Sequence, residues 1–371
     1  MKVGLDVSAV PTHVAGAGRY VVEIARRLPT LDIDTTLVTR IGDAARWSEW
    51  SSQSRVVPLV PTARVQRLAY EAWRLGTTTT ARGVDVWHAP HYTMPHRGTT
   101  PTVVTIHDLT FFTNPEWHER SKVTFFRRAI RYAAHHAEVL ICVSATTSAL
   151  LTQFVPHHAR VVISPHGVDL ERFTPDGAHD DELLRPLGST VPYVLFVGTV
   201  EPRKGLDVLL EAFRAIAARD RTIELWIAGQ AGWGMEGFEG LVERHEAASR
   251  IRRLGFVDDA VLPALMRGAR AVAYPSRGEG FGLPVLEALA CGATVVTSRD
   301  TVMQEIAGDA ALYARVGDSE ELAHALELAL DMSVDQRGAQ VQRARRRATG
   351  FSWAASLAQH QVAYNLARGE G

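Results

Sequence analysis

The segment AVAYPSRGEGFGLPVLE, residues 271–287, carries the local pattern on which the predicted fold depends. Residues 271–274 are apolar and predict a buried strand, and the glycine-rich turn that follows leads into an apolar stretch that predicts a helix. Pro284 suits the first turn of that helix, where its missing N–H costs no hydrogen bond. A strand, a tight turn and a helix in this order are typical of a parallel α/β sheet.

Short strands and helices alternate on both sides of this segment. The expected strands cover residues 2–7, 35–38, 84–87, 102–106, 139–143 and 160–163 in the first half, and 193–197, 224–228, 271–274 and 294–297 in the second. Consecutive helices without strands are expected over residues 320–330, 334–348 and 353–367. This alternation predicts an α/β protein whose parallel sheets are covered by helices on both faces.

The chain has 371 residues, which is more than one hydrophobic core usually supports, so two domains of roughly 170 residues each are expected. The alternation pauses over residues 173–191, where proline, glycine and acidic residues are frequent, and we place the linker there. We predict two doubly wound, Rossmann-like domains, residues 1–174 and 175–350, which face each other across a cleft. Residues 351–371 are expected to form a helix that returns to the first domain.

The composition is that of an ordinary globular protein. Hydrophobic residues make up 46% of the chain and charged residues 22%, and the formal net charge of -1 gives no global field that would attract nucleic acid. No apolar stretch approaches the ~18 residues of a membrane span and no basic leader precedes the first strand, so we expect a cytoplasmic protein. Cys142 and Cys291 lie in separate apolar runs and are expected to be buried free thiols.

Two glutamates flank the glycine-rich turn of the opening segment. The backbone N–H groups of Phe281, Gly282 and Leu283 are expected to point out of a helix N-terminus, which favours an anion such as a phosphate. Glu279 precedes the turn, and Glu287 lies in the first turn of the expected helix. Carboxylates accept paired hydrogen bonds from the neighbouring hydroxyls of a ribose or a pyranose. For either glutamate alone, an acidic loop or a dipole-stabilising residue is the structural alternative.

Arg203 and Lys204 are adjacent, just beyond the end of the strand expected over residues 193–197. An arginine as a fork and a lysine as a point charge can both bind a diphosphate and stabilise the charge that develops when it leaves. Only three of the forty basic residues of the chain are lysines. The use of a lysine here therefore favours a functional ammonium group over a solvated basic turn.

Gly16 and Gly18 follow the first expected strand in the sequence GAGRY, residues 16–20. Glycines let backbone N–H groups approach a phosphate closely, although a plain tight turn is the alternative. A dinucleotide-binding loop would have a third glycine where Val21 stands, and an acidic residue after the second strand, which ends at Arg40. Both departures disfavour an NAD-dependent enzyme.

His107 and Asp108 end the strand expected over residues 102–106, at the edge where catalytic groups of α/β proteins usually lie. His107 could donate to a sugar hydroxyl, and Asp108 could fix its tautomer or shape the loop; a structural His–Asp pair is the alternative. Asp32 and Asp34 form a D-x-D pair before the second strand, where we expect a solvated turn, and no catalytic metal is expected.

Together these motifs resemble those of retaining glycosyltransferase family 4, whose members have the GT-B fold. Residues 279–287 resemble its E-x7-E signature, 201–205 its E-P-x-K-x element, 16–20 its G-x-G-R-Y loop and 107–109 its H-D-L element. The departures are His166 and Gly205, where Asn is common in the family, and Ala293, where Pro is common. His166 is for this reason not counted as catalytic.

The resemblance implies transfer of a sugar from a nucleoside diphosphate to an acceptor hydroxyl with retained configuration and without a metal. By this resemblance the catalytic groups would be Glu279, His107, Arg203 and Lys204, and the donor contacts would come from Gly16, Gly18, Arg203, Lys204, Phe281, Gly282, Leu283, Glu287, Phe256 and Val257. Glu279 and His107 would orient the donor sugar, Glu287 would hold the ribose, and Arg203 and Lys204 would stabilise the leaving diphosphate. The combination of motifs looks most like bacterial mannosyltransferases of polysaccharide assembly, which suggests GDP-mannose and a glycan or lipid-linked acceptor. A nucleotide-sugar epimerase of the same architecture and a non-catalytic nucleotide-sugar binding module are the alternatives.

A helix is expected over residues 118–137, with one apolar and one basic face. The stripe expected to face the core consists of Val123, Phe126, Ile130, Ala133 and Ala137, and the basic face consists of Arg120, Arg127, Arg128 and Arg131, bordered by Phe125 and Tyr132. The basic face is either a solvated surface or a peripheral contact with an anionic membrane or a lipid-diphosphate acceptor.

Overall fold

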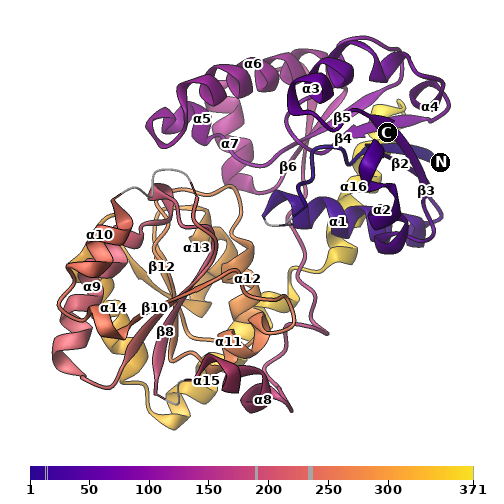
Figure 1. Ribbon diagram of the computed structural model, residues 1–371. Helices are drawn as coiled ribbons and strands as arrows, with labels where there is room; N and C mark the ends of the chain where they lie inside the picture. Colours follow the sequence, from indigo (N-terminus) through magenta and orange to yellow (C-terminus); the bar gives the residue numbers. More distant parts are fainter. Residues whose placement is uncertain (13, 15, 189–190, 233–236, 371) are drawn as a thin grey trace. The chain divides into compact units, whose positions relative to one another are not determined.

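The computed structural model describes residues 1–12, 14, 16–188, 191–232 and 237–370 (Figure 1). The chain forms two compact units, the first made of Met1–Gly167 and Trp353–Gly371 and the second of Val168–Ser352. Each unit contains one parallel sheet with helices on both faces, which confirms the predicted fold class.

The first unit has, over its described residues, a seven-stranded sheet in the order β3-β2-β1-β4-β5-β6-β7. The strands are β1 (Lys2–Asp6), β2 (Asp34–Arg40), β3 (Arg55–Val60), β4 (Val86–Ala89), β5 (Thr102–Ile106), β6 (Val139–Cys142) and β7 (Arg160–Ile163). All neighbouring strands are parallel. The strand order reverses between β1 and β4, and in such sheets ligands bind at the carboxyl ends of the strands at this point.

Helices cover both faces of the first sheet. They are α1 (Ala17–Arg27), α2 (Ala44–Trp50), α3 (Arg64–Trp73), α4 (Thr79–Arg82), α5 (Thr110–Thr113), α6 (Arg120–His136), α7 (Ala145–Phe154) and α16 (Trp353–Ala367). Neighbouring residues of β5 point to opposite faces: Val103 packs in the cluster that includes α1 and α16, and Val104 in the cluster that includes α6 and α7. The sheet is therefore buried on both sides.

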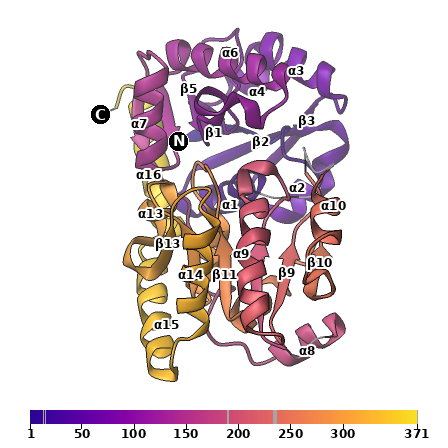
Figure 2. The ribbon, with the colours of Figure 1, turned by 90° about the vertical axis from the view of Figure 1, so that its left-hand side faces the viewer.

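The second unit has a six-stranded parallel sheet in the order β10-β9-β8-β11-β12-β13, as far as its residues are described. The strands are β8 (Tyr193–Val197), β9 (Glu224–Ala228), β10 (Ile251–Gly255), β11 (Ala271–Tyr274), β12 (Val295–Ser298) and β13 (Ala311–Ala314), and the helices are α8 (Asp180–Leu184), α9 (Leu206–Arg219), α10 (Phe238–Glu243), α11 (Leu262–Gly268), α12 (Leu283–Ala290), α13 (Val302–Ala307), α14 (Ser319–Leu330) and α15 (Val334–Thr349). Figure 2 shows α9 and α14 side by side on one face of the sheet. Here the order reverses between β8 and β11.

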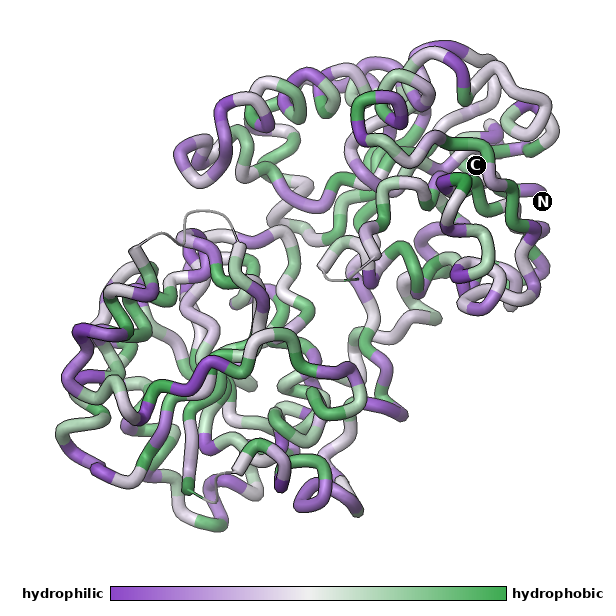
Figure 3. The backbone as a smooth tube through the Cα atoms, in the orientation of Figure 1, coloured by the Kyte–Doolittle hydropathy of each residue, from purple (hydrophilic) through white to green (hydrophobic). Residues whose placement is uncertain are grey.

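The strands lie where the most hydrophobic stretches of the chain gather, in green in Figure 3. The expected strands are confirmed apart from shifts of one or two residues at their ends, and Cys142 and Cys291 are buried free thiols as expected. The strands β3, β10 and β13 were not predicted. All of them lie at a sheet edge, where partial exposure weakens the apolar pattern, and β3 also contains Pro58.

The passage between the two units differs from the linker expected over residues 173–191. The chain passes between them at Gly167–Val168 and Ser352–Trp353. Val168, the first residue of the second unit, donates its N–H to the Phe351 carbonyl at 3.0 Å. Within the expected linker, α8 packs on the second unit through a bidentate ion pair between Asp180 and Arg267, at 2.7 and 2.6 Å. Ser189 and Thr190, also in that segment, lie outside the described residues.

Candidate active site

Glu279 lies at the centre of a buried polar cluster in the second unit, in the loop that follows β11. Its Oε2 accepts from Arg203 Nη1 at 2.5 Å, and its Oε1 forms an ion pair with Lys204 Nζ. Oε1 also accepts from the Tyr274 hydroxyl at 3.0 Å and from Ser276 Oγ at 2.9 Å. The structure therefore brings together Glu279, Arg203 and Lys204, which the sequence predicted separately from two motifs.

A glycine makes the close approach of the two motifs possible. Arg203 and Lys204 form a short 3₁₀ turn after β8, and Gly205 ends this turn with φ of 70°. A Cβ at Gly205 would overlap the Pro275 carbonyl oxygen, so a side chain is excluded there. The Arg277 N–H and Ser276 Oγ both donate to the Arg203 carbonyl, at 2.8 and 3.1 Å. These bonds fix the turn against the loop after β11.

The cluster holds a carboxylate and two cations in a largely buried place. The side chains of Glu279 and Lys204 are 10% and 8% exposed. Burial alone would raise the pKa of Glu279, but Arg203 and Lys204 outweigh it and lower this pKa to about 2. Burial lowers the pKa of Lys204, against the opposing effect of Glu279. Glu201, which accepts from Arg203 Nε at 2.9 Å, adds a second carboxylate.

Tyr274 was not recognised as a site residue from the sequence. Its buried hydroxyl accepts from Lys204 Nζ at 2.6 Å and donates to Glu279, and so joins the two charged groups. Burial raises the pKa of Tyr274 well above its usual value, so the hydroxyl keeps its proton. A tyrosine at the carboxyl end of a buried strand needs a partner for its polar tip, and this was the available signal.

The helix α12 begins at the expected place, but Glu287 is its fifth residue and lies in the second turn, not in the first as predicted. Gly282 precedes the helix with φ of 113°, a conformation that favours glycine. The side chains of Phe281, Leu283 and Glu287 are buried, and the Phe281 ring packs edge-on against Phe351. The buried side chains of this turn are not available to a ligand, so the predicted contact with a phosphate would be made by its backbone N–H groups.

Phe256 and Val257 directly follow β10, at the carboxyl edge of the same sheet. The Phe256 side chain is 56% exposed. An exposed aromatic ring at this edge offers an apolar surface on which a nucleobase could pack.

His107 lies in the first unit, after β5, and is buried. Its Nε2 lies 2.7 Å from the Pro90 carbonyl, which can only accept, so Nε2 carries the proton and Nδ1 is an acceptor. Burial lowers the pKa of His107, against the smaller effects of Pro90 and Asp108, and the ring is neutral. The ring therefore cannot donate through Nδ1 to a sugar hydroxyl as expected; it can accept a hydrogen bond there.

Asp108 shapes the loop after β5 and does not set the His107 tautomer. Its Oδ1 accepts from the Thr110 N–H at 2.9 Å, and its Oδ2 from the Tyr92 hydroxyl at 3.0 Å. Gly16, at the start of α1 in the same unit, is exposed and has φ of 49°, whereas Gly18 is buried within the helix. Of the two glycines predicted to approach a phosphate, only Gly16 is therefore accessible to one.

A buried network connects α16 with the sheet of the first unit. The Tyr20 hydroxyl bonds Thr105 Oγ1 at 2.9 Å and His360 Nε2 at 2.7 Å, and His88 bonds Thr105 and Tyr364 at 2.8 and 2.9 Å. The Tyr20 ring also packs edge-on against His107, with ring centroids 5.2 Å apart. Tyr20 ends the GAGRY sequence, so this motif also has a packing role.

Two Rossmann-like units are the architecture of the GT-B class of glycosyltransferases, and here the second unit carries a buried Arg–Lys–Glu cluster at the carboxyl edge of its sheet. The model described as Glycosyltransferase Family 4 matches residues 14–172, and that described as Glycosyl transferases group 1 matches residues 184–347. The O-antigen chain mannosyltransferase B of Escherichia coli is 30% identical over 393 aligned positions, which cover 99% of this chain and 100% of that protein. The chain belongs to glycosyltransferase family 4, and it is a glycosyltransferase.

A further relative agrees with this assignment, and solved structures share the fold. The phosphatidyl-myo-inositol mannosyltransferase of Mycolicibacterium smegmatis is 32% identical over 242 positions, 64% of this chain and 60% of that protein. Sucrose-phosphate synthase from Thermosynechococcus elongatus has a TM-score of 0.80 at 22% identity, over 97% of this chain and 98% of that one. Anabaena HepE, solved with UDP-glucose, has a TM-score of 0.76 at 19% identity and 98% coverage of both chains. These structures share the fold.

Proposed function

We propose that this glycosyltransferase moves mannose from GDP-mannose to a hydroxyl of a glycan or lipid-linked acceptor, with retention of the anomeric configuration and without a metal. The full-length similarity to the Escherichia coli O-antigen mannosyltransferase supports the sugar and the kind of product. The observation that carries the reaction type is the cluster of Arg203, Lys204 and Glu279, where two cations lie beside a carboxylate at the carboxyl edge of a parallel sheet.

In the proposed reaction Arg203 and Lys204 bind the diphosphate of the donor. When the bond between the anomeric carbon and the phosphate oxygen breaks, the negative charge on the diphosphate grows, and preorganised cations stabilise it. The acceptor oxygen forms the new bond on the face that the phosphate leaves, and its proton passes to the leaving phosphate. Glu279 contacts both cations through its two oxygens, and its proposed role is to hold the hydroxyls of the donor sugar.

The remaining donor contacts belong to the same proposal. Glu287 binds the ribose, the backbone at the start of α12 binds phosphate oxygens, and Phe256 and Val257 lie beside the base. In the first unit, the exposed Gly16 at the start of α1 is proposed to offer its backbone N–H to a phosphate. In support, α12 has the glycine-capped start that a phosphate site needs, and the Phe256 ring is exposed.

A transfer assay tests this function. GDP-mannose, GDP-fucose and UDP-glucose, each labelled in the sugar, are incubated with the protein and a lipid or glycan extract, in the presence and absence of EDTA. We expect label in the extract with GDP-mannose and an α-linked product by NMR. Label that returns as an isomerised nucleotide sugar would show an epimerase, and label that is bound but never transferred would show a binding module.

The proposal includes a peripheral contact with an anionic membrane through α6, and the cytoplasmic location stays a prediction. The core stripe of α6 is confirmed, since Val123, Ile130, Ala133 and Ala137 are buried and Phe126 packs against the core, while Arg120, Arg128 and Arg131 are exposed. The described helices include none that is long and apolar enough to cross a membrane.

The structure also offers Arg127 and Arg131 contacts inside the unit. Arg127 donates to the Phe111 carbonyl at 2.7 Å, and both guanidinium groups lie over the Phe112 ring.

The proposed membrane contact of α6 is tested by co-sedimentation with phosphatidylglycerol liposomes. Wild type should bind at low salt, and a variant with Arg120 and Arg131 changed to Glu, which leaves Arg128 intact, should bind less. Equal sedimentation of both proteins would refute the contact.

A further inference from the structure

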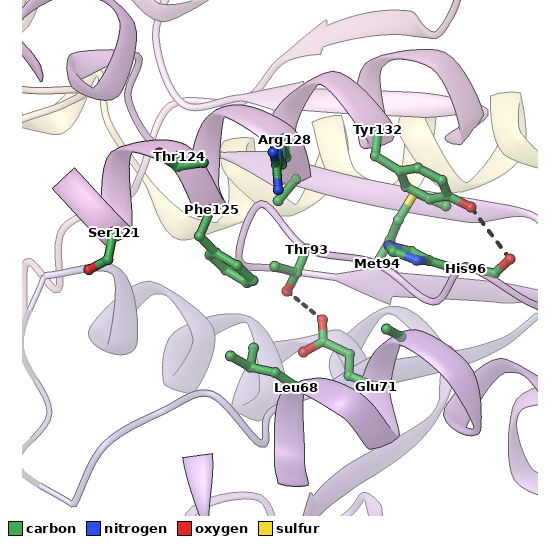
Figure 4. A pocket seen from close by; sticks show the side chains of 12 residues that line it. Leu68, Glu71, Thr93, Met94, His96, Ser121, Thr124, Phe125, Arg128 and Tyr132 are labelled. Atoms are coloured by element: carbon green, nitrogen blue, oxygen red, sulfur yellow. Dashed lines mark hydrogen bonds between the residues drawn. The ribbon is translucent and has the colours of Figure 1, made fainter. Parts of the chain in front are cut away.

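A cavity of about 650 Å³ lies in the first unit between α3 and α6, beside the loop that follows β4 (Figure 4). The reaction proposed above gives this cavity no role. Its size is within the range of ligand pockets, which is about 300 to 1,000 Å³. It opens near the carboxyl end of β4, the strand that pairs with β1 where the strand order reverses. A binding site is therefore expected on positional grounds as well.

One wall of the cavity is a buried carboxyl group. The Glu71 side chain is 5% exposed, accepts a hydrogen bond from the Thr93 hydroxyl, and has Arg67 Nη1 at 3.5 Å from its Oε2. Figure 4 shows Glu71 and Thr93 turned toward each other at this wall. Burial and the neighbouring Asp6 raise the pKa of Glu71 to about 8. The group can therefore both donate and accept near neutral pH, as a sugar hydroxyl also does.

The opposite wall is aromatic and carries one cation. Phe125 is 36% exposed and points from α6 into the space above α3, and the exposed Arg128 lies one turn further along the helix. The Tyr132 ring packs on His96 with centroids 4.0 Å apart, and its hydroxyl donates to the His96 carbonyl at 3.4 Å. This wall offers ring faces beside a guanidinium donor.

A pyranose fits these two walls better than a lipid chain or a free anion. Its C–H faces pack on aromatic rings, and its hydroxyls need partners that donate and accept at the edge of the ring. Glu71 and Thr93 already bond each other, but a lipid chain would cover Arg128 without supplying a hydrogen bond, which is costly for a charged group. Among the residues that line the cavity, a free anion would have a single cation to pair with, the exposed Arg128.

We propose that the cavity between α3 and α6 binds an uncharged pyranose residue of the glycan acceptor. Phe125 stacks on the sugar, and Glu71, Thr93 and Arg128 bond its hydroxyls. The site thus recognises the sugar part of the acceptor and not a lipid part. This inference rests on the proposed function, because a glycan acceptor exists only if the protein is a transferase that extends a glycan.

The first test compares Phe125→Ala with Phe154→Ala. Phe154, at the end of α7, is 37% exposed and does not contribute to the cavity, so it is a matched control for the loss of a surface ring. With oligomannoside acceptors of two to four residues, Phe125→Ala should raise the acceptor KM by about tenfold and leave the donor KM unchanged. Phe154→Ala should change neither constant. Equal acceptor constants for both variants would overturn the proposal.

The second test measures binding without transfer. Saturation-transfer NMR with methyl α-mannopyranoside and α-mannobiose should show contact of the sugar C–H protons with the wild-type protein, and the signal should be lost in Phe125→Ala but not in Phe154→Ala. Decyl phosphate serves as the lipid-like probe and should not displace the sugars. No sugar signal with the wild type, or displacement by decyl phosphate, would overturn the proposal.

The two tests separate this inference from the proposed function. If no nucleotide sugar supports transfer but the sugar signal depends on Phe125, the cavity binds sugars and the proposed reaction is wrong. If transfer proceeds with an unchanged acceptor KM in Phe125→Ala, the reaction stands and the cavity is not the acceptor site. Arg128→Gln adds a variant in an exposed position of α6, where the fold is not at risk, and we expect a smaller rise of the acceptor KM.

Discussion

Glu279→Gln is the substitution that tests the buried cluster most directly. Glutamine keeps the shape of the side chain and removes the negative charge between Arg203 and Lys204. The pKa of Glu279 falls from 4.5 to about 2 in the folded protein, and this difference corresponds to ~3 kcal/mol of stability at neutral pH. Burial also lowers the pKa of Lys204, and this cost remains in Glu279→Gln, where the ammonium has lost its main counter-charge.

We therefore expect Glu279→Gln to lower the free energy of unfolding at pH 7 by ~3 kcal/mol, measured by urea denaturation. The difference from wild type should shrink as the pH falls below 4.5, because a lowered carboxyl pKa contributes stability that is lost between 4.5 and about 2. Glu201→Gln is the control: Glu201 pairs with Arg203 only and is 29% exposed, so its effect should be smaller.

The same variant separates the effect of the cluster on turnover from its effect on nucleotide binding. Turnover of Glu279→Gln should fall by about a hundredfold or more, because the carboxylate assigned to the hydroxyls of the donor sugar is lost. Affinity for GDP, measured by calorimetry, should stay within about threefold, because both cations remain. Unfolding free energies equal to wild type at pH 7, or a GDP affinity that falls in parallel with turnover, would refute this reasoning.

The remaining predictions concern the same two units. Lys204→Ala and Arg203→Ala should each weaken GDP binding by one to two decades, because a charge-assisted contact contributes about 1.5 to 3 kcal/mol; unchanged calorimetric affinity would contradict the assignment. Transfer should persist in EDTA, and activity that is abolished by the chelator and restored by manganese would show a metal requirement. Glu71→Gln should gain stability relative to wild type as the pH rises from 4.5 to about 8, because the folded protein keeps a proton there that the unfolded chain releases; parallel thermal-melting profiles of the two proteins from pH 5 to pH 8 would speak against it.

The alternation of strands and helices was readable from the sequence because the apolar period of a buried strand is set by its own few residues. The central strands and the turn before α12 followed from this local rule and from the glycine positions. The edge strands β3, β10 and β13 did not, because half-exposed strands tolerate polar residues such as Arg252 and Arg253. The passage between the units was missed because α8 is held by an ion pair with a residue 87 positions away.

The sequence by itself determined which residue types stand at the carboxyl ends of the strands: the Arg–Lys pair, the two glutamates and the His–Asp pair. Only the tertiary structure decided that Tyr274 joins Lys204 to Glu279, that Pro90 fixes the His107 tautomer, and that α3 and α6 enclose a cavity. The hydrophobic pattern of a single strand or helix does not predict any of these contacts, because each one joins different elements of the fold. Tyr20 and His360, for example, are 340 positions apart in the chain. Such pairs form because a buried polar group needs a partner, and the packing of the units determines which partner lies within reach.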